Sequence, residues 1–224
     1  MKFSFEYKSS DSPLVDGIWR TEGMGGSFIS VAESNSGLVI TRQRDKITLT
    51  VRGPETLAST APVPEDAEIF GIVFKLGTFM PSLPLSKLVD RPINLPEAGS
   101  QSFWLHGSAW QFPDFENIDT FITRLVREGL LVSDPVIDTV LQDQSPYLSS
   151  RTVQRRFLQA TGLTYNTIQQ IKRAQLAMSF LQQGKSILDT VAEAGYFDQP
   201  HLTRSLKHYV GQTPAQLIRS NQSE

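Results

Sequence analysis

The sequence predicts an α+β fold, in which a β-rich, barrel-like N-terminal domain is followed by an all-α domain. Apolar and polar residues alternate at several places before residue 112, at the period of a half-buried strand, and apolar residues recur at helical spacing from residue 117 onward. Charge also divides along the chain. Nine basic and four acidic residues follow residue 145, a net +5, whereas the 12 basic and 19 acidic residues before it give −7. A basic part joined to an acidic part suggests a polyanionic partner for the basic one.

The β-rich part is predicted from strands and from the turns between them. Phe3, Phe5 and Tyr7 alternate with polar residues, and so do Ile47, Leu49 and Val51. Further strands are expected over residues 27–32, 38–42, 68–76 and 101–105. Gly-rich residues 23–26 predict a hairpin turn. Several short strands within about 110 residues are typical of a sandwich or a small barrel.

The helical part begins at a segment that can link two domains. Asn117 can cap a helix with an apolar stripe over residues 118–126, and Asp134 and Pro135 suit the N-cap and first position of the next helix. Four later glycines fall where helices should end, as left-handed C-terminal caps do: Gly162, Gly184, Gly195 and Gly211. We therefore expect a β-rich domain over residues 1–116, a linker helix over 117–133 and a helical domain over 134–224.

Residues 149–161 predict a helix with two unlike sides, capped by Ser149 or Ser150. The apolar side consists of Val153, Phe157 and Ala160. The opposite side displays Arg151, Gln154 and Arg155. Arg can pair bidentately with guanine and Gln with adenine in the major groove. An ordinary amphipathic helix with a solvated basic face gives the same pattern, so this segment alone leaves both interpretations open.

Residues 186–210 predict two helices joined by a turn at Gly195. Ile187, Leu188 and Val191 are expected to face inward from the first helix. Asp198 can cap the second, whose buried stripe is Leu202, Leu206 and Tyr209 and whose outer side carries His201, Arg204, Lys207 and His208. This pattern is typical of a helix-turn-helix, although helical hairpins of other function show it too. Residues 165–183, with Ile168, Ile171, Ala174, Met178 and Leu181 on one face, would join two such subdomains.

The stretches RTVQRRF…TGLT, ILDTVAEAGYFDQPHLTRSLK and the closing GQTP resemble the DNA-binding domain of AraC/XylS-type transcription regulators over about the last 75 residues. The resemblance implies a sequence-specific, double-stranded-DNA-binding regulator that reads the major groove with two recognition helices. The resemblance implies that Arg151, Gln154 and Arg155 of the first helix point toward bases. It also implies that the second helix places Gln199, His201, Thr203 and Arg204 in or near the groove. Lys207 of the same helix would contact a phosphate.

The resemblance also implies a role for the N-terminal domain, which in this family often binds a small effector or mediates dimerisation. A homodimer and, for an activator, RNA polymerase are the further partners expected. One departure concerns the first subdomain. The family usually has a distinct scaffolding helix before the first recognition helix, but here only Gln144–Leu148 separates the Asp134 helix from Ser149. We therefore expect a truncated or rearranged first subdomain.

Other classes of protein find little support in the residues. The chain has no cysteine, which excludes disulfides and thiolate metal sites, and it has no P-loop, GxGxxG or GxSxG motif. It also has no close pair of histidines and no His-x-His motif, which disfavours a metal-dependent cupin enzyme. We expect no metal site, no cofactor and no enzymatic activity. The first residues do not look like a secretory signal, and no apolar run could span a membrane. The prediction is a cytoplasmic protein without a membrane partner.

Two alternatives stay open: a β-barrel enzyme with a helical appendage, and a helix-turn-helix module that binds protein. The first depends on the N-terminal half. His106 is isolated there, which favours a structural role. An aromatic group could line an apolar ligand cavity, but a domain core would use the same residues: Phe103, Trp104, Trp110, Phe112 and Phe115.

Overall fold

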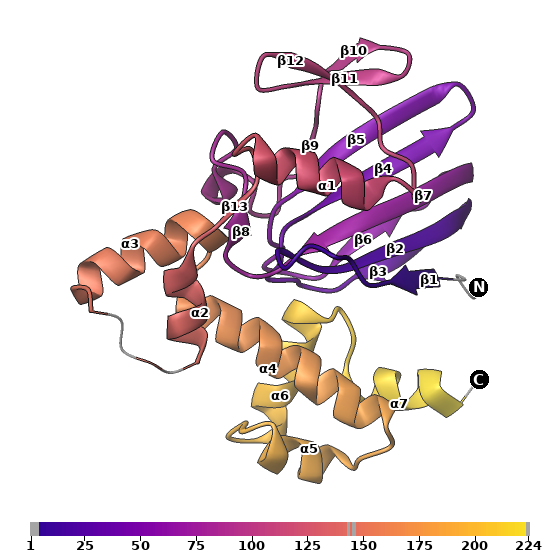
Figure 1. Ribbon diagram of the computed structural model, residues 1–224. Helices are drawn as coiled ribbons and strands as arrows, with labels where there is room; N and C mark the ends of the chain where they lie inside the picture. The colour runs from indigo at the N-terminus through magenta and orange to yellow at the C-terminus, as the bar shows by residue number, and fades with distance from the viewer. Residues whose placement is uncertain (1–4, 143, 145–146, 223–224) are drawn as a thin grey trace. The chain divides into compact units, whose positions relative to one another are not determined.

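A computed structural model describes residues 5–142, 144 and 147–222 of the chain, which form two compact units (Figure 1). Unit 1 comprises the described parts of Met1–Gly26, Asn35–Pro54 and Pro62–Thr164. Unit 2 comprises Ser27–Ser34, Glu55–Ala61 and the described residues from Tyr165 onward. Two short segments of the N-terminal half therefore belong to the same compact unit as the last helices. The predicted domain boundaries after residues 116 and 133 stay predictions.

Unit 1 is built on an antiparallel six-stranded sheet in the order β1-β2-β7-β4-β5-β9. Its strands are β1 (Phe5–Lys8), β2 (Val15–Met24), β4 (Gly37–Gln43), β5 (Lys46–Arg52), β7 (Glu65–Phe74) and β9 (Ile93–Asn94). The sheet ends at β1 on one side and β9 on the other, so these strands form an open sheet. The predicted β-rich region is confirmed, but its six-stranded sheet does not close into a barrel.

One face of this sheet packs against α1 (Ile118–Arg127), which lies across it in Figure 1. Alternation in β5 places Leu49 and Val51 in the core, as predicted. The helix contributes Ile122 and Leu125, which are fully buried. The expected Asn117 does occupy the N-cap, but its side chain makes no cap bond and its Oδ1 accepts instead from the amide of Asp114.

The edge strand β1 differs from its prediction. Phe5 and Tyr7 are exposed, whereas the alternation predicted a half-buried strand. The rings of these two residues stack at 5.9 Å, and Phe5 meets Trp19 edge-on at the same distance. The rings of Phe5 and Tyr7 thus contact each other and Trp19 on the surface of the edge strand and are not buried in the core. Phe3 lies outside the described residues.

The smaller sheets of unit 1 bring the aromatic residues into the core. One contains β10 (Glu97–Gly99), β11 (Ser102–Leu105) and β12 (Ser108–Gln111), and the other pairs β8 (Thr78–Phe79) with β13 (Val132–Ser133). Four of the five predicted aromatics are buried in the main core and Trp104 is exposed. This arrangement favours the core interpretation over a ligand cavity. His106 and Gly107, with φ of 49° and 79°, form the turn between β11 and β12, which is a structural position.

The Gly-rich turn after β2 does not make the predicted hairpin. Gly25 and Gly26 have φ of 76° and 87°, which glycine adopts readily. The next strand, β3 (Ser27–Ser30), does not return along β2 but pairs with β6 (Ser59–Pro62). We call residues 27–34 and 55–61 together the ribbon. A bridge between Glu33 and Glu55 continues the pairing beyond the strands.

The remaining helices follow the predicted order. In unit 1, the 3₁₀ turn η1 (Leu85–Lys87) precedes α2 (Pro135–Leu141) and α3 (Ser150–Thr161). Unit 2 contains α4 (Tyr165–Gln182), α5 (Ile187–Glu193), α6 (Gln199–Tyr209) and α7 (Pro214–Gln222). The four predicted capping glycines all have positive φ, between 70° and 85°. Seven α-helices are thus present in the described part of the chain.

The core of unit 2 forms around the long helix α4. Ile168, Ile171, Ala174 and Leu181 are fully buried, as the apolar stripe predicted, and Met178 is partly buried against the same core. Over the residues that the structure covers, no helix is both long and apolar enough to cross a membrane. Within the same residues, no cluster of three or more His, Asp and Glu side chains is placed to hold a metal ion.

Candidate nucleic-acid interface

Helices α5 and α6 form a helix-turn-helix whose two starts are fixed by side-chain caps. The hydroxyl of Ser186 accepts a hydrogen bond from the amide of Asp189 at 3.1 Å at the start of α5. The carboxylate of Asp198 accepts from the amide of His201 at 2.7 Å at the start of α6, which confirms the predicted cap. Each cap satisfies an amide that the first turn of a helix leaves without a partner.

The outer side of α6 carries the side chains that the sequence singled out. Leu202 and Leu206 are fully buried on the inner side. Arg204 and Lys207 are exposed on this outer side, and Gln199 is exposed in the first turn of the helix. His201 and Thr203 are half-buried, since the His201 ring meets Tyr196 edge-on at 5.1 Å and the Thr203 hydroxyl donates to the Gln199 carbonyl at 2.9 Å. The helix therefore presents two cations to solvent on its outer side and one amide in its first turn.

The turn between α5 and α6 is fixed from two directions. The hydroxyls of Tyr196 and Ser205 are 2.8 Å apart and buried, which ties the turn to the middle of α6. From α4, the Arg173 guanidinium lies 4.4 Å from the centre of the Tyr196 ring, and its Nη1 donates to the Gly195 carbonyl at 3.3 Å. The sequence patterns identified none of these three side chains. Arg173 is recognisable only from the packing of α4 beside this turn.

The ribbon caps the other end of α6. The amide of Ala58 donates to the carbonyl of His208 at 2.8 Å, and the amide of Ala32 donates to the carbonyl of Tyr209 at 2.7 Å. The last carbonyls of a helix have no partner within the helix. Here two backbone amides from the N-terminal half supply partners, so the end of the candidate recognition helix depends on residues far away in sequence.

Packing around these bonds is close. Ala32 is fully buried, and its carbonyl accepts from Gln175 Nε2 of α4 at 2.9 Å. A Cβ atom added to Gly211, just after α6, would lie 2.9 Å from Ile29 Cγ2 and 3.2 Å from Ala58 Cβ. The φ of Gly211 is 77°, so two independent constraints favour glycine there. The ribbon is therefore an integral part of unit 2.

The first candidate reader, α3, lies in unit 1 and displays the predicted basic side. Ser149 caps it by accepting from the Thr152 amide at 3.3 Å. Arg151, Gln154 and Arg155 are all exposed. On the opposite side, Phe157 and Ala160 are buried, as predicted, and Val153 is half-buried. Whether the exposed side chains contact bases stays a prediction.

Helix α2 supports α3 through a bidentate ion pair. Arg156 donates to the Asp134 carboxylate from Nη2 at 2.6 Å and from Nε at 2.8 Å. This hydrogen bonding is the main cause that raises the pKa of Arg156 above its ordinary value. The same carboxylate caps α2 by accepting from the Val136 amide, as expected. The connection Gln144–Leu148 lies partly outside the described residues. The seven-residue α2 thus precedes α3 where the family has a distinct scaffolding helix.

Two apolar residues of the helix-turn-helix are exposed, one of them against its prediction. Leu188 of α5 was predicted to face inward but is 73% exposed, and that prediction is wrong. Thr190 is fully buried instead, between the partly buried Ile187 and Val191. Phe197, which immediately precedes the Asp198 cap, is 91% exposed. The sequence shows Phe197 as an apolar residue just before an N-cap. Such a residue usually packs against the helix, so nothing in the sequence indicated that Phe197 is exposed.

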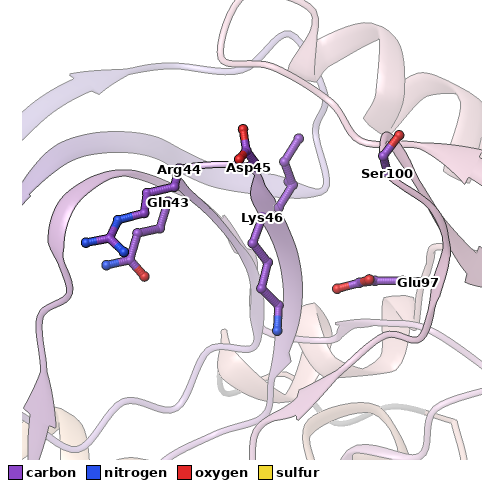
Figure 2. A pocket seen from close by; sticks show the side chains of 7 residues that line it. Gln43, Arg44, Asp45, Lys46, Glu97 and Ser100 are labelled. Atoms are coloured by element: carbon purple, nitrogen blue, oxygen red, sulfur yellow. The ribbon is translucent and has the colours of Figure 1, made fainter.

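Unit 1 also carries an open, polar groove (Figure 2). It has a volume of 640 Å³ and is lined by the β4–β5 turn and by the loop around β10. Figure 2 shows the Glu97 carboxylate pointing toward the strand that carries Lys46. The lining is mostly polar and charged, unlike the apolar cavity that the aromatic residues suggested. An effector site therefore stays a prediction.

Comparisons with known proteins agree on the helical half. Residues 147–220 match a family model described as a helix-turn-helix domain. The HTH-type transcriptional regulator RipA of Corynebacterium glutamicum is 32% identical over 88 residues, which are 38% of this chain and 27% of RipA. The match therefore spans about a quarter of that relative's length.

Two solved structures are similar over almost all of the chain. ToxT from Vibrio cholerae in its P21 form is 9% identical and covers 96% of this chain and 98% of its own, with a TM-score of 0.39. ToxT from Vibrio cholerae O395 bound to (E)-4-(8-methylnaphthalen-1-yl)but-3-enoic acid is 8% identical, covers 97% and 99%, and has a TM-score of 0.42. Residues 147–220 are a helix-turn-helix domain, similar to the DNA-binding domain of AraC/XylS-type transcription regulators.

Proposed function

We propose that this protein binds duplex DNA at specific sequences and regulates transcription, with α6 as its principal reader in the major groove. The observation that carries the proposal is the two-sided character of α6. Its buried side holds the helix on α4, its outer side offers Arg204 and Lys207 to solvent, and Gln199 is exposed in its first turn. A helix of this kind fits the major groove, where Arg and Gln can bond base edges.

Each outer side chain has a role that follows from its chemistry. Arg204 would donate two bonds to a guanine, and Gln199 would pair with an adenine edge. His201 and Thr203 are half-buried and would contribute shorter-range contacts in or near the groove. Lys207 would bind a phosphate as a point charge and so set position more than sequence.

Helix α3 would be the second reader, through Arg151, Gln154 and Arg155. All three are exposed on one side, and the Arg156–Asp134 pair would hold the helix to α2. Because α2 has only seven residues, we infer that α3 contributes less base discrimination than α6. Substitutions in α3 should therefore reduce sequence preference less than those in α6.

The β-rich N-terminal half would sense a small effector or form a homodimer, and an activator would also contact RNA polymerase. Support for this part comes from the family, whose N-terminal domains often have these roles. We propose no catalytic role for the sheet and expect no cofactor.

Selection from a random duplex library by the purified full chain tests the proposal. The full chain is required because the ribbon lies in the N-terminal half. We expect enrichment of one motif, and loss of that enrichment in an Arg204→Ala/Gln199→Ala variant. Glu97→Gln in the groove of unit 1 is the matched control and should leave the motif unchanged. Failure of the full chain to enrich any motif would reject the proposal.

A further inference from the structure

Phe197 is an exposed aromatic residue at the start of the candidate recognition helix. Its side chain is 91% exposed and stands one residue before Asp198, the N-cap of α6. Truncating so exposed a ring should cost the fold little, because it has almost no buried contact area to lose. The fold itself therefore gives no reason for a large apolar side chain here.

The local helix-start pattern makes this exposure unusual. An apolar residue just before an N-cap often packs on the fourth helical residue, as a hydrophobic staple. In α6 that fourth residue is Leu202, which is apolar and fully buried, so the residue against which Phe197 could pack is present. With 91% of Phe197 left exposed, little of the ring can pack there. Tyr196, one residue earlier, fills the inner position and is buried.

The surroundings of Phe197 favour a polar, negatively charged partner with one apolar group. The next residues toward α6 are Asp198 and the exposed Gln199, and Arg204 and Lys207 follow on the outer side of the same helix. Between residues 186 and 209, Leu188 and Phe197 are the only large apolar residues that stay exposed, which is less apolar surface than a protein-binding patch needs. In the major groove the only apolar group among the base edges is the 5-methyl group of thymine, which Phe can contact. The first residues of a recognition helix are also those nearest the bases.

We propose that the Phe197 ring contacts the 5-methyl group of a thymine at the edge of the α6 footprint and so selects T at that position. The inference rests on the proposed DNA-binding function and adds a specificity determinant to it. The exposed face of the ring supplies the contact, and loss of water from the ring and the methyl group provides the preference.

The test uses the full chain and the duplex motif obtained by library selection. Each thymine in turn is replaced by deoxyuridine, which keeps every hydrogen-bonding group and removes only the methyl group. We expect the wild type to bind about fourfold more weakly at one substituted position, the factor for one buried methyl group. Phe197→Ala should bind the unmodified motif more weakly and lose the discrimination at that position only.

Leu188→Ala is the matched control, because Leu188 is another exposed apolar residue of the same helix-turn-helix but lies on α5. It should keep the wild-type response to deoxyuridine. Phe197→Leu should keep part of the response, and the melting temperature of each variant shows whether it is folded.

Two results would overturn the inference. One is a Phe197→Ala protein that still discriminates thymine from deoxyuridine as the wild type does. The other is a wild type that binds its motif but is indifferent to every deoxyuridine substitution. Both leave the proposed DNA-binding function intact. If the wild type selects no motif at all, the proposed function fails first and this inference with it.

Discussion

Arg156 and Asp134 join two helices through a single carboxylate. Asp134 Oδ1 accepts from Arg156 Nη2 at 2.6 Å and from the Val136 amide at 3.0 Å, while Oδ2 accepts from Arg156 Nε at 2.8 Å. One side chain thus serves as the N-cap of α2 and as the anchor of α3. The orientation of the first candidate reader therefore depends on a residue outside it.

Replacement of Asp134 should separate these two roles. Asp134→Ala removes the cap and the ion pair, and the cap alone should cost about 1 kcal/mol. Asp134→Asn keeps a capping oxygen and removes the charge, so it should destabilise the protein less. Amide hydrogen exchange in α2 and α3 measures the difference. Equal exchange in the two variants would show that the ion pair, rather than the cap, holds these helices.

Arg204→Ala should lower the affinity for the selected DNA motif by roughly 1–3 kcal/mol and relax the preference at one base pair. A guanine partner loses two donors at once, and no other side chain replaces them. Binding to the motif and to single-base variants measures both effects. An equal loss on every sequence would instead identify Arg204 as a phosphate contact.

Lys207→Ala should weaken binding by a similar factor on all sequences. Removal of one phosphate contact should also lower the slope of log K against log salt by about one. A titration from low to high salt measures this slope, with Lys185→Ala as a control because Lys185 is paired with Glu193 within unit 2. An unchanged slope would remove Lys207 from the backbone contacts.

Ala58→Pro should loosen the end of α6. Proline has no amide hydrogen, so the His208 carbonyl loses its donor, at about 1 kcal/mol for one net hydrogen bond. Ala58→Gly keeps the amide and is the matched control. Hydrogen exchange in the last turn of α6 should increase more in the proline variant. If both variants exchange alike, the ribbon bond does not stabilise this helix end.

Tyr209 should make unit 2 sensitive to alkaline pH. Burial, with a smaller contribution from Tyr196, raises its pKa above the ordinary 10.0, although Arg173 opposes the change. A pKa raised by folding means that stability is complete below about pH 10 and falls as the pH rises through the folded pKa. Tyr209→Phe should reduce this loss in unfolding experiments from about pH 8 to 11. The same change at the fully exposed Tyr147 should have no effect.

Local signals predicted the helical half well. Caps depend on residues adjacent in sequence, so Asp134 and Asp198 could be assigned from the sequence alone, and the cap of α3 could be narrowed to Ser149 or Ser150. The glycines after each helix were equally local. The inward orientation predicted for Leu188 was wrong because α5 has only two turns, and its inner side is already filled by Thr190 and its partly buried neighbours.

Long-range pairing was beyond the sequence patterns. A strand was expected over residues 27–32, but the sequence could not tell whether it would return along β2 or pair with β6, since a strand pattern does not identify its partner. The same limit applies to the open edges of the main sheet. Phe197 and Arg173 were missed for a related reason, because neither exposure nor a contact across helices can be read from spacing alone.

The ribbon has a consequence for how the protein is made. Chains emerge from the ribosome N-terminus first, and segments distant in sequence meet slowly because a long loop must close. Ala32 and Ala58 are synthesised early, and the carbonyls that they cap belong to one of the last helices. Until α6 has been synthesised, these two amides can bond only to water or to another partner. Completion of the candidate recognition helix is therefore expected to be a late folding event, which requires the ribbon and α6 to meet.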